Sequence, residues 1–421
     1  MFLHGIFPPI TTPFYPDGRV YHKKLEANVE RYSRTPVAGI VVLGSTGESI
    51  LLSDQERRDV FKTALAAAAP KKVMIAGTGI ESAIETLRLT EYAATLGYDC
   101  AMVRTPHYYK KQMHPANMLA FYRTVADSSP LPVVIYNFPP ATGYDIPAEV
   151  VIALAQHPNI IAIKESAGNL DKVKAIIDGT RHVKRQATVT ETFEAATPRM
   201  LKGAETDTAR ESRELVSVEA LSGSECGADI LARGRDTDRV GTGALARPAS
   251  AHVGAGALVR GRQTAPVSPA GVVDRPGGTK LRSEPERTSA VPSSSAVTVV
   301  GNLKTRQKEV GFQVMVGAAH QLESSLALGA VGAILAFACP APTACYEIYA
   351  ALKEGDTALA REKQERIRLA AQRIVSDLGV PGVKYAMDLN GYYGGPSRLP
   401  FLPLTDDLKS EIERLMAGIR S

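Results

Sequence analysis

Short apolar, β-branched runs alternate with amphipathic stretches from the N-terminus onward, and this alternation predicts the fold. Runs that are apolar throughout are typical of parallel strands covered on both faces. We expect eight strands, over residues 5–12, 38–45, 72–79, 98–105, 132–138, 160–166, 312–319 and 331–338. Eight such strands close a (β/α)8 barrel. A doubly wound open sheet is the alternative, but no dinucleotide-binding glycine pattern follows the first run.

The amphipathic stretches between and after these strands predict helices. Ser53 and Asp54 mark the start of the first clear one. The expected helices cover residues 53–69, 82–97, 147–157, about 169–179, 358–379 and 406–419. The chain is therefore expected to divide into the first six barrel strands (1–181), an insertion (182–304), the last two strands (305–356) and a C-terminal helical extension (357–421).

From His182 to Lys304 the alternation stops. The segment has a single aromatic residue, Phe193, and is rich in Arg, Ala, Gly, Ser, Thr and Pro. It can bury too little apolar surface to offset its ordering entropy, so we expect a largely disordered low-complexity insertion between the sixth helix and the seventh strand. Such a connection lies opposite the strand C-termini, away from a barrel active site. Two interpretations of this segment stay open: a genuine insert, and translated non-coding sequence such as a retained intron.

Composition narrows the classes of function. The chain is 44% hydrophobic and 22% charged, with a net charge of +5 and no long basic run, which argues against nucleic acid as a partner. No apolar stretch is long enough to span a membrane, and a strand that begins near Gly5 leaves no room for a signal peptide. We expect a cytoplasmic protein; a mitochondrial location is not excluded, although no transit peptide is visible. Four cysteines at no metal-like or redox-like spacing predict reduced side chains: Cys100, Cys226, Cys339 and Cys345.

Polar residues follow several predicted strands at the end where barrel enzymes keep their sites. Lys164 ends the apolar run "IIAIKES", and burial there would lower its pKa from about 10.4 toward neutrality. A neutral lysine forms a Schiff base with a ketone. Tyr136, one strand away, is placed to relay protons, and the amides of the turn "GSTGES" (44–49) suit a carboxylate. Taken singly, these features are ordinary; their convergence predicts a site for a 2-oxo acid.

Several motifs resemble those of one enzyme family. They are "GSTGES", "TPHYY", "YNFPPATG", "IKES" and "GVPGVKYAMDLNGYYGGPSRLP". The chain resembles the pyruvate-dependent class I aldolases, the family of dihydrodipicolinate synthase and N-acetylneuraminate lyase, over roughly residues 1–181 and 305–421. The resemblance implies a (β/α)8 barrel with a C-terminal helical extension that assembles as a homodimer or homotetramer. It also implies catalysis without a metal or organic cofactor, on small 2-oxo acids such as pyruvate and glyoxylate.

The resemblance implies a role for each matching residue. Lys164 matches the Schiff-base lysine and Tyr136 the proton-relay tyrosine. Ser45 matches the hydroxyl that links the relay, and the backbone of Ser45 and Thr46 would bind the carboxylate of pyruvate. Tyr108 matches a tyrosine that the family supplies across its dimer interface.

Four further positions bear on the substrate. Gly317 and Ile334 match residues that line the pyruvate pocket in the family. Ala141 stands where the synthase branch carries an arginine that binds the carboxylate of the aldehyde partner. Its absence removes a charge-assisted hydrogen bond worth up to about 3 kcal/mol. Arg104 is a candidate replacement, although we expect it to form a salt bridge outside the barrel.

Within the family the chain most resembles the 4-hydroxy-2-oxoglutarate aldolase branch, in the stretches "RTPHYYKKQM", "AQHPNIIAIKES" and "NGYYGGPSR". We therefore expect a lyase that cleaves 4-hydroxy-2-oxoglutarate to pyruvate and glyoxylate. Dihydrodipicolinate synthase, which condenses pyruvate with aspartate semialdehyde, is one alternative, and a 2-keto-3-deoxy sugar-acid aldolase is another. The alternative outside enzymes is an inactive barrel that acts as an interaction scaffold. The lysine, tyrosine and glycine-turn set argues against the scaffold, since that role needs none of these residues.

Overall fold

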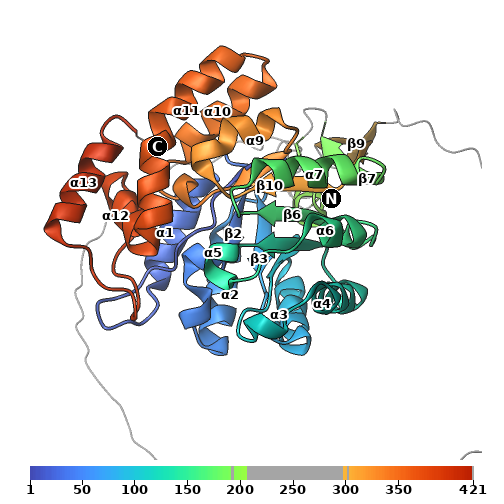
Figure 1. Ribbon diagram of the computed structural model, residues 1–421, viewed down its shortest axis with the longest axis horizontal. Helices are drawn as coiled ribbons and strands as arrows, with labels where there is room; N and C mark the ends of the chain where they lie inside the picture. Colours follow the sequence, from blue (N-terminus) through green and yellow to red (C-terminus); the bar gives the residue numbers. More distant parts are fainter. Residues whose placement is uncertain (191–193, 206–296, 301–302, 420–421) are drawn as a thin grey trace, which may run out of the picture. The chain divides into compact units, whose positions relative to one another are not determined.

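The computed structural model describes residues 1–190, 194–205, 297–300 and 303–419, and these contain a closed parallel barrel. Its strands are β1 (Gly5–Phe7), β2 (Gly39–Val42), β3 (Val73–Gly77), β4 (Cys100–Arg104), β5 (Val133–Asn137), β6 (Ile160–Glu165), β10 (Gln313–Val316) and β11 (Gly332–Ile334). They pair in the order β1-β11-β10-β6-β5-β4-β3-β2. Figure 1 labels β2, β3, β6 and β10 among them. The Ala38 amide donates to Ile6 O at 2.9 Å, so β2 also joins β1 and the sheet closes. All eight predicted strands are confirmed.

Helices cover the outside of the barrel. Those that precede the insertion are α1 (His22–Ser33), α2 (Asp54–Ala67), α3 (Ala83–Leu96), α4 (Pro115–Ser128), α5 (Pro139–Thr142), α6 (Ala148–Leu154) and α7 (Leu170–Thr180). Helix α2 begins where its sequence predicts, because Ser53 and Glu56 form a reciprocal capping box. Helices α9 (Leu322–Ala327) and α10 (Pro342–Lys353) follow the last two strands.

The predicted C-terminal helical extension is present. It consists of α11 (Thr357–Ala371), a π-helical segment (Gln372–Asp377), α12 (Gly379–Leu389) and α13 (Asp406–Met416). These elements pack on one another and on α10, in orange and red in Figure 1. The sequence did not predict α12, because its first turn contains Pro381 and two glycines. No helix among the described residues is both long and apolar enough to cross a membrane.

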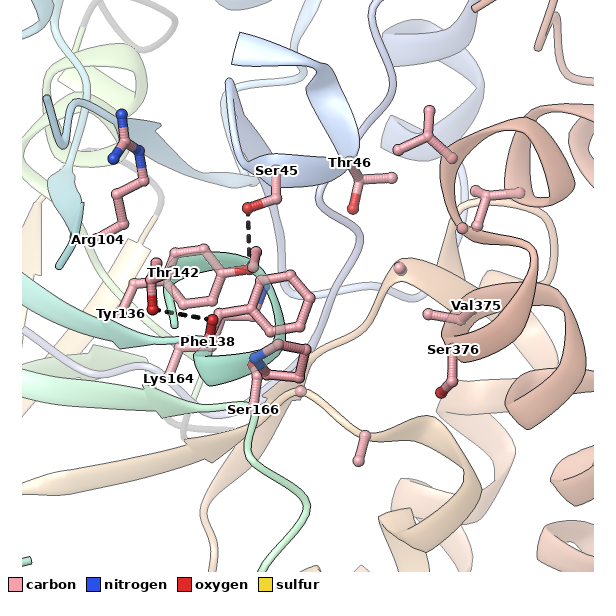
Figure 2. Close-up of a pocket in the computed structure, with 18 of the residues that line it drawn as sticks. Ser45, Thr46, Arg104, Tyr136, Phe138, Thr142, Lys164, Ser166, Val375 and Ser376 are labelled. Carbon is pink, nitrogen blue, oxygen red and sulfur yellow. Dashed lines mark hydrogen bonds between the residues drawn. The ribbon is translucent and has the colours of Figure 1, made fainter. Parts of the chain in front are cut away.

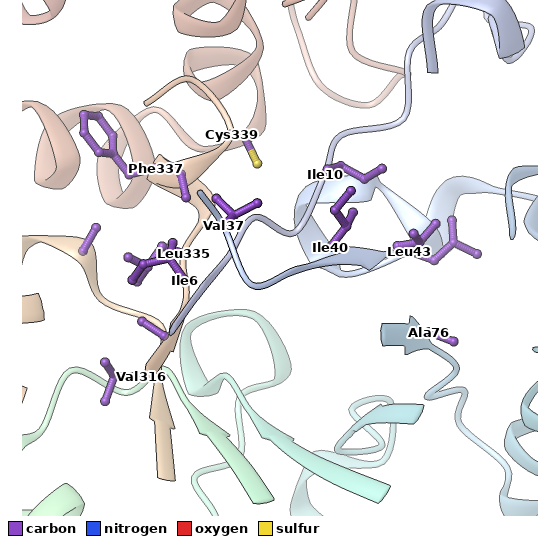
Figure 3. Close-up of a cluster of buried hydrophobic side chains, with 14 of the residues drawn as sticks. Ile6, Ile10, Val37, Ile40, Leu43, Ala76, Val316, Leu335, Phe337 and Cys339 are labelled. Carbon is purple, nitrogen blue, oxygen red and sulfur yellow. The ribbon is translucent and has the colours of Figure 1, made fainter. Parts of the chain in front are cut away.

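Two apolar clusters hold the barrel together. Inward side chains such as Phe7, Met102 and Met315 fill its interior. Outward side chains pack against the helices, and Figure 3 shows a part of this layer formed by Ile6, Ile10, Val37, Ile40, Leu43, Ala76, Val316, Leu335, Phe337 and Cys339. Because the strands are buried on both faces, they read as continuous apolar runs in the sequence. Three of the four cysteines are free and buried, as predicted, and Cys226 lies outside the described residues.

A second, antiparallel sheet stands at the two ends of the insertion. Its strands are β7 (Arg185–Thr190), β8 (Thr298–Val300) and β9 (Leu303–Val310), in the order β7-β9-β8. The sequence predicted that residues 182–304 are largely disordered and indicated none of these strands, so it missed β7, β8 and the start of β9. The expected disorder of the remainder falls mainly on residues 206–296, which lie outside the described residues.

The described ends of the insertion lie on the predicted side of the barrel. Phe2, just before β1, packs against Ala187 and Val189 of β7. The Arg185 guanidinium donates to the carbonyls of Ala155 and His157, just before β6, at 2.6 and 2.8 Å. Both contacts are at the N-terminal ends of the barrel strands. The small sheet is therefore opposite the end that carries Lys164.

A buried ion pair ties the C-terminal extension to the barrel. Lys384 of α12 is only 1% exposed, and its Nζ lies 2.5 Å from Oε1 of Glu48. The same Nζ donates to the carbonyls of Thr12 and Pro396, each at 2.9 Å. Glu48 follows the "GSTG" turn and has φ of 53°, a left-handed conformation that non-glycine residues seldom adopt. Each charge compensates the burial of the other, so the pair holds the turn in place.

Replacing Lys384 by Met should destabilise the protein strongly. The variant leaves the Glu48 carboxylate buried without a cation, and we expect a loss of about 3–5 kcal/mol in the free energy of unfolding. Urea unfolding measures this loss, and the double variant Glu48→Gln/Lys384→Met should recover part of it. Lys409→Met is the control, since it removes a surface pair with Asp406 and should change stability by no more than about 1 kcal/mol. Equal, small losses in both single variants would contradict the role of the pair.

Candidate active site

A pocket of about 570 Å³ opens at the C-terminal ends of the strands (Figure 2). Its lining includes five of the seven predicted catalytic and substrate-binding residues, Ser45, Thr46, Tyr136, Lys164 and Gly317. They come from the ends of β2, β5, β6 and β10, which the barrel brings to one mouth. Barrel enzymes keep their active sites at this end.

Lys164 occupies the inner part of this pocket. Along β6, Ile163 points outward to the helices while Lys164 points inward, because side chains alternate along a strand. The residue is 5% exposed, and its amine forms no ion pair or hydrogen bond within the described ranges. Burial lowers the pKa of Lys164 to about 7. A substantial share of the amine is therefore neutral near pH 7 and able to attack a ketone.

Tyr136 and Ser45 complete a proton path beside Lys164. Tyr136 is the register partner of Lys164 on β5, and Nζ of the lysine lies 4.2 Å from the centre of the phenol ring. The Tyr136 and Ser45 hydroxyl groups are 3.2 Å apart, the contact dashed in Figure 2. Burial raises the pKa of Tyr136 to about 12, so the phenol stays protonated and can donate to an oxygen formed next to Lys164.

The turn after β2 faces the same space. Ser45 to Gly47 form one 3-10 turn, in which the amides of Gly47 and Glu48 donate to the carbonyls of Gly44 and Ser45. No backbone acceptor is found for the first two amides of the turn, those of Ser45 and Thr46, within the described ranges. Free amides at the start of a turn suit a carboxylate.

Gly317 leaves room at the end of β10. A Cβ atom added there would clash with the Ser166 hydroxyl and lie 2.8 Å from Cβ of Ser166, which cannot rotate away. The Ser166 hydroxyl is itself buried and has no hydrogen-bond partner among the described residues. The close approach of β10 and β6 therefore requires glycine at this position.

Two predicted site residues lie elsewhere. Tyr108 is 75% exposed and is not part of the pocket lining, so its supply across a subunit interface stays a prediction. Ile334 is fully buried inside the barrel, in the same cluster as Tyr136, and does not line the pocket. His320 and Ser376 do line it, and the sequence did not indicate them. Neither belongs to a motif, and only the packing of the extension brings Ser376 to the mouth.

Arg104 lines the pocket as well, which corrects one expectation. Its Nη1 lies 3.1 Å from Oε1 of Glu81, so the predicted salt bridge is present. The predicted location outside the barrel is wrong, because Arg104 pairs in register with Tyr136 and shares its inward face. Ala141 also lines the pocket, so no cation enters from that position. No group of three His, Cys, Asp or Glu side chains suited to a metal occurs in the described part of the chain.

The fold and the site together define a class of proteins, the (β/α)8 barrels with a desolvated lysine at the mouth. A lysine in this setting can form an imine with a ketone. The sequence profile of the Dihydrodipicolinate synthetase family matches residues 2–205 and 293–418, and the chain belongs to this family. The match is interrupted within the insertion that the sequence pattern had marked.

Individual relatives agree with this assignment. The 4-hydroxy-tetrahydrodipicolinate synthase of Methanosarcina barkeri is 39% identical over 176 residues, and that of Xanthomonas campestris 41% over 177. Each alignment spans 42% of this chain, but only 59% and 58% of the relative. The crystal structure of dihydrodipicolinate synthase DapA-2 from Bacillus anthracis superposes with a TM-score of 0.65 at 18% identity, covering both chains in full. This superposition confirms the fold.

The pKa of Lys164 predicts how imine formation depends on pH. Only the neutral amine attacks, so below pH 7 the rate should rise about tenfold per pH unit, and it should level off above pH 7. Trapping of a 2-oxo acid with cyanoborohydride, followed by mass spectrometry between pH 5.5 and 9, measures this rate. A rate that continues to rise steeply to pH 9 would show a lysine of ordinary pKa and contradict the desolvation of Lys164.

Proposed function

We propose that the protein forms a Schiff base between Lys164 and pyruvate and makes or breaks a carbon–carbon bond next to it. The observation that supports this most directly is the buried amine, unpaired among the described residues, whose Nζ lies 4.2 Å from the centre of the Tyr136 ring. The names of the curated relatives agree, because they are synthases of the same family.

The chemistry follows from the arrangement of the side chains. The amine of Lys164 attacks C2 of pyruvate while the amides of Ser45 and Thr46 hold its carboxylate. The attacking amine and Tyr136 each give one proton to the former carbonyl oxygen, which leaves as water, and Tyr136 regains its proton through Ser45 when C3 is deprotonated. The resulting iminium withdraws electrons, so C3 loses a proton and the enamine attacks an aldehyde. In the reverse direction the C4 hydroxyl loses its proton, and the bond between C3 and C4 breaks.

Two reactions that pass through the pyruvate enamine are candidates for the function of this protein. The names of the relatives favour aspartate semialdehyde, the partner of the synthase, over the cleavage of 4-hydroxy-2-oxoglutarate that the sequence favoured. Ala141 supports the second candidate, because it faces the pocket where the synthase branch carries its arginine. We retain both, since they share the pyruvate half of the reaction. A homodimer or homotetramer is also proposed, with the exposed Tyr108 at the interface.

Borohydride reduction in the presence of pyruvate tests the proposal. We expect a stable adduct that maps to Lys164, and no adduct in Lys164→Arg, because the guanidinium stays protonated. Lys72→Arg is the matched control: Lys72 is 4% exposed, but it does not line the pocket, so this variant should keep the adduct. An intact protein that gains no adduct would refute the aldolase proposal and favour a scaffold.

A substrate panel separates the two partners. Initial rates are measured for condensation of pyruvate with aspartate semialdehyde, and for cleavage of 4-hydroxy-2-oxoglutarate and of a 2-keto-3-deoxy sugar acid. Ala141→Arg should raise kcat/KM for the semialdehyde by up to about 100-fold, since it restores a charge-assisted hydrogen bond of up to about 3 kcal/mol. Faster condensation than cleavage in the unsubstituted protein would identify a synthase and exclude the hydroxyoxoglutarate aldolase.

A further inference from the structure

Arg104 is placed two strands away from Lys164 on the same rim of the barrel. The Cα atoms of Arg104, Tyr136 and Lys164 are register partners across β4, β5 and β6. Neighbouring strands are about 4.8 Å apart, so the Arg104 and Lys164 backbones are separated by roughly 10 Å. Figure 2 shows the guanidinium of Arg104 directed away from the Lys164–Tyr136 pair. A molecule bound to Lys164 by one end therefore has Arg104 near its other end.

The path of the Arg104 side chain is specified by its neighbours. A Cβ atom at Gly79, just after β3, would lie 2.8 Å from Cγ of Arg104 and 2.4 Å from its backbone nitrogen. Only glycine at residue 79 allows this approach. Nη1 is held by Oε1 of Glu81 at 3.1 Å and by Nδ1 of His107 at 2.7 Å. These two contacts hold the guanidinium through one of its nitrogens, Nη1.

The opposite edge of the guanidinium has no partner in the described part of the chain. Nε is buried and lacks a hydrogen-bond acceptor among the described residues. Both side-chain contacts that the group makes with described residues use Nη1, so Nη2 has no partner in that part of the chain either. The N–H bonds of Nε and Nη2 are parallel and match the two oxygens of a carboxylate. A buried donor without an acceptor is costly, and here it points to an acceptor that arrives with a ligand.

The charges around Arg104 also favour an anion. Among the described residues, it is the only arginine that lines the pocket, and Ala141 contributes no cation from the next loop. Burial lowers the pKa of Arg57, and the charge of Arg104 lowers it further, so a second cation stands near Arg104. Glu48, the acidic residue in the lining, is already paired with Lys384. Glu81, outside the lining, accepts from Nη1 of Arg104 and from the amides of His107 and Tyr108. A second carboxylate would therefore meet the free edge of Arg104 and no unpaired acidic group among the described residues.

We propose that the Nε–Nη2 edge of Arg104 binds the distal carboxylate of a dicarboxylic 2-oxo acid held at Lys164. This inference rests on the proposed function and specifies its substrate class. It assigns to β4 the role that the synthase branch gives to an arginine at the position of Ala141. A bidentate pair fixes the orientation of the bound chain as well as its charge.

Two ligands of equal chain length test the assignment. 2-Oxoglutarate and 2-oxopentanoate share the carboxylate and the ketone and differ at C5, which is a carboxylate in the first and a methyl group in the second. Each competes with pyruvate for trapping at Lys164, and the readout is the concentration that halves the pyruvate adduct. Arg104→Gln should raise this concentration about 10- to 100-fold for 2-oxoglutarate and leave it within about twofold for 2-oxopentanoate.

Two further variants make the comparison decisive. Arg104→Lys keeps the charge but loses the parallel N–H pair, so its loss should be intermediate, and it decides the question if Arg104→Gln fails to fold. Arg88→Gln removes a comparable Arg–Glu pair at the surface, with Glu85, and should change neither ligand. Equal weakening of both ligands, or of neither, by the Arg104 variants would overturn the inference. Loss of pyruvate trapping in the unsubstituted protein would overturn the proposed function itself.

Discussion

The candidate site depends on one constraint, which is that no described residue places a counter-charge next to Lys164. A second lysine in the same protein shows why. Lys384 is buried too, and burial lowers its pKa, but Glu48 at 2.5 Å opposes this shift and two carbonyls accept from its amine, so its role is structural. Lys164 has no such partner among the described residues, and burial alone brings its pKa to about 7. A buried lysine therefore stabilises the fold when it is paired with a carboxylate, and it can act as a nucleophile when it is not.

The Glu48–Lys384 ion pair and the site around Lys164 are connected through the turn after β2. Glu48 ends this turn, and Ser45 begins it with a hydroxyl directed at Tyr136. Arg398 of the extension also donates its backbone N–H to Oε2 of Glu48 at 2.8 Å. The C-terminal extension thus holds the element that positions the proton path. A barrel built without the extension would leave a buried carboxylate and an unsupported turn at the mouth.

The pocket is asymmetric in charge, and this asymmetry bears on the choice of substrate. Its inner part contains an amine of lowered pKa and two hydroxyl groups, which suit the ketone end of a 2-oxo acid. Its outer part contains Arg104, held at one corner by Glu81 and His107. Ala141 contributes no cation from the loop after β5. Family membership alone does not identify the compound that reacts with pyruvate. That choice depends on which strand or loop supplies the positive side chain that binds its carboxylate.

The eight strands and the candidate centre follow from the amino-acid sequence alone. Strands buried on both faces must be apolar throughout, and parallel strands bring their C-terminal residues to one mouth, so the positions of Lys164, Tyr136 and Ser45 along the chain suffice to group them. The inward face of Arg104, the Glu48–Lys384 pair and the β7–β9 ladder emerge only in the folded chain. Each of these depends on contacts between segments far apart in the chain or on the phase of a strand in the closed barrel. Local pattern carries no information on such contacts, because their energies exist only after the chain has folded.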